Sequence, residues 1–252
     1  MGEALIGGWV ASGLEPVDIL VVDASPDRLA EVCSRHGVRP AELAEAASAD
    51  LVVLAIKPHQ VPSLLPRLSP LLGEATLVVS IAAGVTLAVL ESALPGVAVV
   101  RVMPNTPALV RKGMAGVVAG TLAEEHQVAA VETLMSAVGA AVVVEEKQLD
   151  ALTALSGSGP AYLFYVAEAM IEAGVHQGLS RGEATLLVNQ TFVGAAAMLD
   201  ESGRSATQLR EMVTSPAGTT AAALRELDDH GVRSGFLAAI EACRARSESL
   251  AR

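Results

Sequence analysis

Residues 215–220 read Ser-Pro-Ala-Gly-Thr-Thr and combine a turn with two adjacent hydroxyls, just before an alanine-rich stretch. A helix that begins here leaves its first N–H groups without intrahelical partners, at the positive end of its dipole. Gly218 lets a ligand approach the backbone closely, and Thr219 and Thr220 offer hydroxyls that donate or accept hydrogen bonds. The segment predicts a site for a small anion. Taken alone, it is more typical of an ordinary helix cap.

Residues 155–162 form a second unusual segment, Leu-Ser-Gly-Ser-Gly-Pro-Ala-Tyr. Its glycines permit close approach of a helix or a cofactor. A structural role and a catalytic role fit this segment equally well. Because both segments occur in one chain, we favour the anion site over the simple cap for residues 215–220.

Small and polar residues also follow several apolar runs that are typical of buried strands. Ligands of open parallel sheets bind at the carboxyl ends of the strands, so these residues predict a dinucleotide crevice. The cofactor-binding candidates from this pattern are Asp23, Ser25, Ala55, Lys57, Pro58, Ala82 and Asn105. Asp23 is suited to accept hydrogen bonds from a ribose, but an Asx turn uses the same residue equally often. A lone lysine such as Lys57 is more often simply solvated.

The elements that must position these residues change in kind along the chain. Continuous Val/Ile/Leu runs predict strands buried on both faces, with helices between them. The strands are expected at residues 19–22, 51–56, 77–81, 97–103, 114–119 and 141–145. The pattern predicts an α/β, Rossmann-type, doubly wound parallel sheet over residues 1–146.

Residues 147–252 have helical spacing and no strand pattern, which predicts an all-helical domain. Its helices are expected at 148–176, 181–201, 204–213, 219–229 and 232–250. Residues 184–199 are apolar on more than one face, so we expect a second subunit to cover them.

Composition excludes several classes of protein. The chain has 252 residues, is 52% hydrophobic and carries a formal net charge of −11. That charge argues against nucleic-acid or anionic membrane partners, and the apolar stretches are too short and too interrupted for a membrane span. The two cysteines, Cys33 and Cys243, form no spaced cluster, so we expect no metal site and a reduced, cytoplasmic protein.

Three motifs, in this order, resemble the pyrroline-5-carboxylate reductase family. They are residues 102–108 (Val-Met-Pro-Asn-Thr-Pro-Ala), residues 155–162, and Thr-Ser-Pro at 214–216 with Gly-Thr-Thr at 218–220. The resemblance covers essentially the whole chain, and three such motifs together are far more specific than any one of them.

The resemblance implies reduction of the cyclic imine Δ1-pyrroline-5-carboxylate to L-proline, the last step of proline synthesis, by hydride from NADPH or NADH. It also implies a helical dimerisation domain interleaved with that of a partner, in a homodimer or larger homo-oligomer. By position, the resemblance assigns the substrate carboxylate to Ser215 and to the N–H groups of Gly218 and Thr219. It also implies a hydrogen bond from the hydroxyl of Thr220 to the ring nitrogen, which makes Thr220 the catalytic candidate.

The choice of cofactor depends on the turn after the strand at 19–22. Asp23 favours a free 2′-hydroxyl and therefore NADH, whereas Ser25 and Arg28 are suited to a 2′-phosphate. The resemblance implies a slight preference for NADPH. Gly2 is suited to be the last glycine of a G-x-G-x-x-G fingerprint, so we expect the first strand and the other glycines upstream of Met1.

Two alternatives remain at this point. The first is another enzyme of the same architecture that acts on a 3-hydroxy acid or another imine. Such an enzyme would often use a lysine in its long helix, and residues 149–180 contain none. The second is a non-catalytic or truncated, inactive paralogue that acts as a helical interaction module. The missing glycine loop favours this second alternative, and the intact turn at Thr219 and Thr220 argues against it.

Overall fold

A computed structural model describes residues 1–250, and contacts divide the chain into two compact units. The first unit comprises Met1–Pro160 and the end of the chain from Cys243; the second is Ala161–Ala242. By contacts the division therefore falls at the start of helix α8, Gly159–His176. The predicted division between residues 146 and 147 marks where the strand pattern ends.

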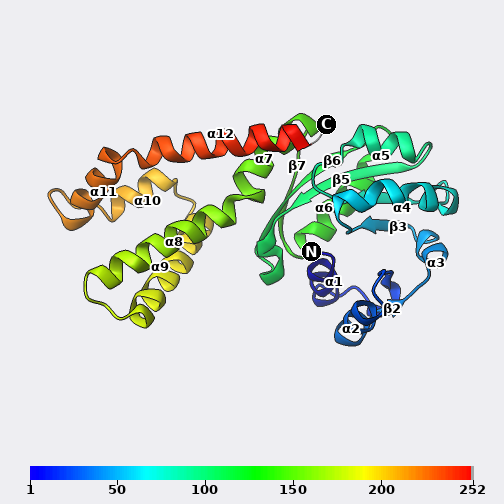
Figure 1. Ribbon diagram of the computed structural model, residues 1–252, viewed down its shortest axis with the longest axis horizontal. Coiled ribbons are helices and arrows are strands. Elements are labelled where there is room, and N and C mark those ends of the chain that lie inside the picture. Colours follow the sequence, from blue (N-terminus) through cyan, green and yellow to red (C-terminus); the bar gives the residue numbers. More distant parts are fainter. Residues whose placement is uncertain (251–252) are drawn as a thin grey trace. The chain divides into compact units, whose positions relative to one another are not determined.

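The first unit alternates strands and helices (Figure 1). Its strands are β1 Leu20–Val21, β2 Arg39–Pro40, β3 Leu51–Leu54, β4 Leu77–Ser80, β5 Ala98–Pro104, β6 Gly113–Ala119 and β7 Gly139–Val143. Its helices are α1 Gly2–Ala11, α2 Pro26–His36, α3 Leu43–Ala47, α4 Val61–Leu68, α5 Leu87–Ala93, α6 Glu125–Ser136 and α7 Leu149–Leu152. The six predicted strands are all present, whereas the short elements β2 and α3 were not predicted.

Five strands form one sheet in the order β3–β4–β5–β6–β7, and β1 and β2 form a separate parallel pair. Strands β3, β4 and β5 are parallel, as are β6 and β7. Strand β6 is antiparallel to β5, a departure from the all-parallel sheet that the sequence predicted. Only the short turn Thr106–Val110 links them, and a parallel crossover needs a dozen or more residues, so the chain must reverse.

Alternate side chains of the central strands face opposite sides of the sheet, and each side has its own core. One core joins α1 and α6 to the sheet through Leu5, Trp9, Val131, Met135, Val79, Val100 and Val117. The other joins α4 and α5 to the sheet through Leu65, Leu68, Leu90, Val78, Val99 and Val118. Helices on both faces of a largely parallel sheet confirm the predicted doubly wound fold.

The second unit contains only helices among the described residues. Besides α8 it includes α9 Arg181–Glu201, α10 Ala206–Met212 and α11 Thr219–Asp229, and helix α12, Val232–Leu250, starts within it. Helix α9 begins with a capping box, in which Ser180 and Glu183 each accept a hydrogen bond from the other's backbone N–H.

The predicted helix over residues 148–176 is not continuous. A π-helical turn, Thr153–Gly157, separates α7 from α8 and falls on the small-residue segment 155–162. The strand expected before Gly2 concerns residues outside the described chain. Within residues 1–250, no helix combines the length and the apolar character needed to cross a bilayer.

Candidate functional site

The N-terminus of α1 lies beside the end of strand β3. A Cβ atom added to Gly2 would lie 3.0 Å from the Cβ of Ala55, so a side chain at Gly2 would crowd this contact. No side chain caps α1, and its first intrahelical bond runs from the N–H of Leu5 to the carbonyl of Met1. The N–H groups of Gly2, Glu3 and Ala4 are therefore open. This end fits an anionic group such as a pyrophosphate.

The turn after β1 holds Asp23 and Ser25 in a fixed arrangement. Oδ1 of Asp23 accepts the N–H of Ser25 at 2.8 Å, which is the geometry of an Asx turn. The hydroxyl of Ser25 in turn accepts the N–H of Arg28 at 3.4 Å and caps α2. The sequence left open whether Asp23 forms such a turn; it does, and its second carboxylate oxygen has no partner among the described residues.

The candidates after β3 and β4 differ in exposure. Ala55, Lys57 and Pro58 are exposed, and Lys57 forms no ion pair within the described chain. Ala82 is buried, and its N–H donates to the hydroxyl of the fully buried Ser80 at 3.4 Å. The small side chains of Ala55 and Ala82 suit the close approach of a flat group such as a nicotinamide or adenine ring.

Asn105, at the end of β5, is buried and uses its amide inside the protein. Its Oδ1 accepts the N–H of Met114 at 2.8 Å, and its Nδ2 donates to the carbonyl of Ser156 at 2.9 Å. The side chain therefore joins the end of β5 and the start of β6 to the π-helical turn. Its role as a cofactor ligand stays a prediction, and the structure gives it a positioning role.

The π-helical turn itself is held by further bonds. The N–H of Ser158 donates to the carbonyl of Thr153 at 2.8 Å, and the hydroxyl of Ser156 donates to the carbonyl of Leu152 at 3.1 Å. The thiol of Cys243, on α12, donates to the Ser158 hydroxyl at 3.3 Å. Such turns are common at functional sites, where they displace the backbone from regular helical geometry.

We expect Asn105→Ala to lower the free energy of unfolding by about 2 kcal/mol, because it leaves the Met114 N–H and the Ser156 carbonyl without partners. Asn105→Asp should also be destabilising, because it keeps an acceptor for the Met114 N–H but places a buried carboxylate oxygen against the Ser156 carbonyl. Urea unfolding followed by circular dichroism measures both. Equal stability of Asn105→Ala and the parent chain would contradict the positioning role.

The turn before α11 places the candidates of the second unit. Its Ala217 has a φ of 55°, in the left-handed region that favours glycine. A Cβ added to Gly218 would lie 2.3 Å from the Ser215 hydroxyl, so a side chain here would displace that hydroxyl. The N–H of Gly218 donates to the carbonyl of Ser215 at 3.0 Å, which closes the turn.

Helix α11 starts at this turn without a side-chain cap. Its first intrahelical bond runs from the N–H of Ala222 to the carbonyl of Gly218 at 3.1 Å. The open N–H groups are thus those of Thr219, Thr220 and Ala221, one position later than the Gly218 and Thr219 pair expected from the resemblance. Neither threonine hydroxyl has a hydrogen-bond partner within the described residues. Open N–H groups and free hydroxyls together suit a carboxylate with an adjacent ring nitrogen.

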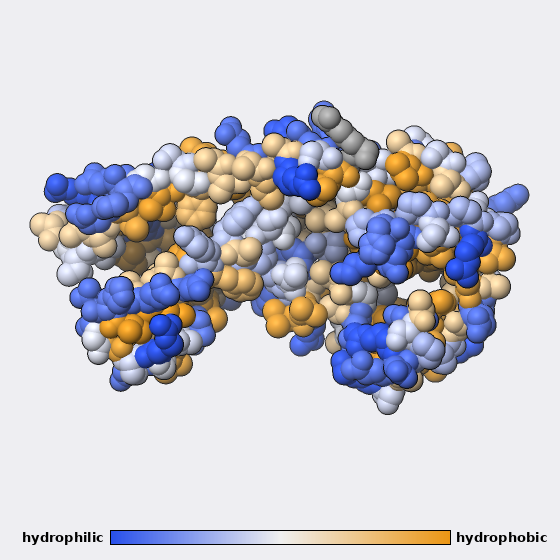
Figure 2. Space-filling model, viewed as in Figure 1, coloured by the Kyte–Doolittle hydropathy of each residue, from blue (hydrophilic) through white to orange (hydrophobic). Residues whose placement is uncertain are grey.

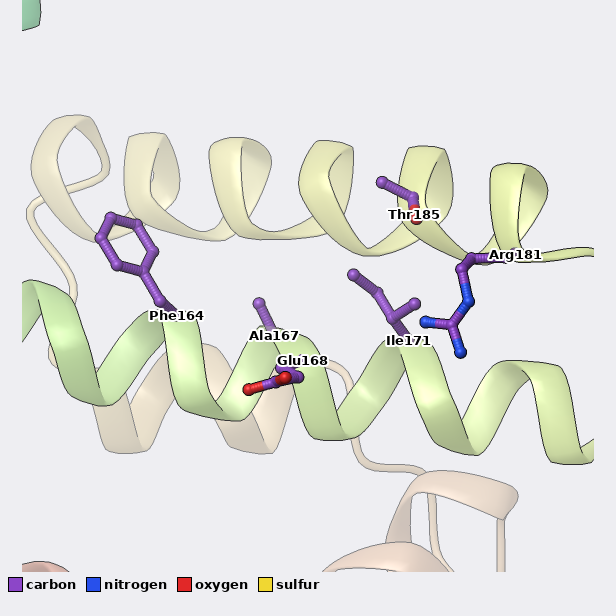
Figure 3. Close-up of a pocket in the computed structure, with 6 residues that line it drawn as sticks. All are labelled: Phe164, Ala167, Glu168, Ile171, Arg181 and Thr185. Atoms are coloured by element: carbon purple, nitrogen blue, oxygen red, sulfur yellow. The ribbon is translucent and has the colours of Figure 1, made fainter.

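A shallow groove of about 390 Å³ lies between α8 and α9, and none of these candidates lines it (Figure 3). It is lined by Phe164, Ala167, Glu168, Ile171, Arg181 and Thr185. In Figure 3, Ile171 points from α8 toward α9, and the side chain of Arg181 extends from the start of α9. The described residues contain no group of three or more His, Cys, Asp or Glu side chains arranged to hold a metal ion.

Two family models match the chain. Residues 146–250 match a model described as pyrroline-5-carboxylate reductase dimerisation. Residues 1–84 match one described as NADP oxidoreductase, coenzyme F420-dependent.

Relatives and solved structures match nearly the whole chain. A pyrroline-5-carboxylate reductase of Corynebacterium melassecola is 45% identical over 99% of this chain and 95% of its own length. The structure of a pyrroline-5-carboxylate reductase from Coxiella burnetii has a TM-score of 0.95 and 38% identity, covering 100% of this chain and 95% of that one. A Plasmodium falciparum pyrroline carboxylate reductase with NADP bound has a TM-score of 0.87 and 29% identity, with coverage of 100% and 95%.

Proposed function

The chain belongs to the pyrroline-5-carboxylate reductase family, and we propose that it reduces Δ1-pyrroline-5-carboxylate to L-proline with NADPH or NADH. The observation that carries this proposal is the turn at residues 215–220, whose open N–H groups and hydroxyls suit the substrate, in a chain that matches the family over its length. The NADP oxidoreductase match and the NADP-bound structural relative support the use of a nicotinamide dinucleotide.

The first unit supplies the residues for the cofactor. The open end of α1 at Gly2 suits the pyrophosphate, and Asp23 suits a ribose hydroxyl. Ser25, Ala55, Lys57, Pro58 and Ala82 complete the proposed site at the strand ends. When bound, the cofactor supplies the hydride for reduction of the imine.

The second unit supplies the residues for the substrate. We assign the carboxylate to the Ser215 hydroxyl and to the N–H groups of Thr219 and Thr220, because the N–H of Gly218 already closes the turn. Gly218 contributes by lacking a side chain, which would collide with Ser215. The Thr220 hydroxyl then orients the ring nitrogen.

The chemistry requires little from ionisable side chains. The imine nitrogen must carry or receive a proton for its carbon to accept a hydride, and a threonine is a weak acid. Thr220 therefore holds the nitrogen in place and relays a proton from water, while the remaining rate enhancement comes from positioning. Thr220 is the proposed catalytic residue.

The direct test is oxidation of NADH and of NADPH by the purified chain with pyrroline-5-carboxylate. We expect loss of the reduced nicotinamide absorbance, with L-proline formed in equal amount by chromatography, and no change without the imine. Cofactor binding without any turnover would contradict the proposal and favour the non-catalytic interaction module.

The helical region matched by the dimerisation model supports assembly into a homo-oligomer, and we infer a homodimer. Large apolar side chains are exposed along α8 and α9: Phe164 is 69%, Tyr165 75% and Leu186 71% exposed. Figure 2 shows apolar residues on the surface of these helices. Large apolar side chains that are exposed together along two helices are rare on monomers, and a second copy of the chain would cover them.

Leu186→Asp should therefore shift the chain toward monomer, because it places a charge in the proposed interface. Light scattering after size-exclusion chromatography measures the mass. Gln177→Asp is the matched control, since it places the same charge in the exposed turn between α8 and α9 and should leave the mass unchanged. An unchanged mass for Leu186→Asp would exclude this face as the interface.

We also propose a cytoplasmic location. Cys33 and Cys243 are both free and only partly buried, which fits a reducing compartment.

A further inference from the structure

The groups that could meet a 2′-phosphate on the cofactor are already engaged within the protein. The Ser25 hydroxyl caps α2 through the N–H of Arg28. Pro26 occupies the first position of α2 and has no N–H to donate. In the first turn of this helix only the N–H of Asp27 remains open, next to its own carboxylate. The helix end therefore lacks the donors that usually bind an anion.

Arg28, the cation nearest in sequence to this turn, is held between two carboxylates. It donates through Nη1 to Glu31 at 2.6 Å and through Nη2 to Glu3 on α1. Arg35 also donates to both carboxylates, at 2.6 Å to Glu3, and His36 contacts Glu3 at 3.1 Å. Arg28 thus belongs to an ion-pair network that joins α1 to α2.

Both carboxylates of this network are charged near neutral pH. Partial burial disfavours the charged form of Glu3, but hydrogen bonds from His36, Arg28 and Arg35 outweigh it and lower its pKa. The hydrogen bond from Arg28 likewise lowers the pKa of Glu31. Arg28 and Arg35 therefore share two full negative charges, so the charge of Arg28 is already balanced.

The charge of the segment is unfavourable for a further phosphate. Between residues 23 and 31, the three carboxylates of Asp23, Asp27 and Glu31 outnumber the single cation Arg28. A 2′-phosphate would meet this excess and would compete with Glu3 and Glu31 for the charge of Arg28. A ribose with a free 2′-hydroxyl needs only an acceptor, which the free carboxylate oxygen of Asp23 provides.

We propose that this turn selects a cofactor whose adenosine ribose has a free 2′-hydroxyl, so that the chain prefers NADH to NADPH. Asp23 accepts a hydrogen bond from the 2′-hydroxyl. The ion pairs of Arg28 with Glu3 and Glu31 determine the specificity, because they keep this cation from binding a 2′-phosphate. This inference rests on the proposed function and reverses the slight preference for NADPH that the family resemblance implied.

The test uses two fragments that report this part of the cofactor without any turnover: adenosine 5′-monophosphate and adenosine 2′,5′-bisphosphate. Isothermal titration of the full chain gives a Kd for each. Because like charges placed together disfavour binding strongly, we expect the monophosphate to bind roughly 10- to 100-fold more tightly.

Two variants should lower this ratio by different routes. Glu31→Gln releases Arg28 from one carboxylate and should tighten binding of the bisphosphate. Asp23→Asn keeps the acceptor of the Asx turn, but it loses the charge and should weaken the monophosphate. The matched control is Glu45→Gln, which removes the same charge from the exposed Arg39–Glu45 pair at 2.8 Å and should not change the ratio.

Tighter binding of the bisphosphate by the parent chain would overturn this inference and leave the reductase assignment intact. An equal shift in Glu31→Gln and Glu45→Gln would overturn the role of the Arg28 ion pairs, because net charge alone would then explain the result. If the chain binds neither fragment and neither full cofactor, both this inference and the proposed function fail.

Discussion

Thr220→Ala is expected to lower kcat/KM for pyrroline-5-carboxylate by roughly 10- to 100-fold, the loss of one hydrogen bond to a charged group in the transition state. The Thr220 hydroxyl is free of other partners in the described chain, so its removal leaves no unpaired group behind. Because the cofactor candidates belong to the first unit, the Kd of the cofactor should not change. Steady-state kinetics and titration with the dinucleotide measure the two quantities separately.

Thr220→Ser is the matched control, because it keeps the hydroxyl and removes only a methyl group. We expect it to retain most of the activity. Activity of Thr220→Ala equal to that of the parent chain would exclude this residue from catalysis. An equal loss in both variants would instead show that the methyl group, and hence packing of the α11 start, matters.

Much of the fold could be predicted from local signals. The run at residues 51–56 gives β3, and that at 77–81 gives β4, because strands covered on both faces must be apolar throughout. Ser25 and Pro26 start α2 as predicted, since a cap and a proline are favourable at a first turn. Periodicity and caps are short-range features, which is why sequence alone reveals them.

The remaining features are not indicated by the apolar runs and caps. The apolar runs of β5 and β6 do not show that β6 reverses beside β5; the short link between the two strands requires it. The left-handed conformation of Ala217 is hidden because alanine rarely adopts it. The pairing of Glu3 with Arg28 was also missed, since it joins two helices that only the folded sheet brings together.

The candidate site shows the same limit. The sequence identified the turn at residues 215–220 and the strand-end residues from their types. It did not show that the N–H of Gly218 is used inside the turn, or that both ends of the Asn105 amide are occupied. Residue types indicate which groups are available for binding, whereas hydrogen-bond geometry decides which of them remain free.

Glu146→Ala is expected to lower the free energy of unfolding by about 2–4 kcal/mol, because it leaves a buried cation without its partner. Oε1 of Glu146 accepts from Nη1 of Arg101 at 2.8 Å and from the N–H of Leu87 at 2.7 Å. The Arg101 side chain is only 10% exposed, whereas that of Glu146 is 35% exposed, so water offsets part of the loss. Urea unfolding measures the change, and Glu74→Ala, at an exposed carboxylate without an ion pair in the described chain, should cost almost nothing.

A double-mutant cycle separates the ion pair from the helix cap that Glu146 also provides at α5. In the parent chain, Glu146→Gln removes the charge, although the amide oxygen still accepts the Leu87 N–H. This change should be destabilising, because the buried Arg101 then lacks an opposite charge. In an Arg101→Met background no buried charge remains, so the same change should cost little. If the two losses simply add, Arg101 and Glu146 are not coupled, and the stabilising effect of Glu146 comes from its bond to α5 alone.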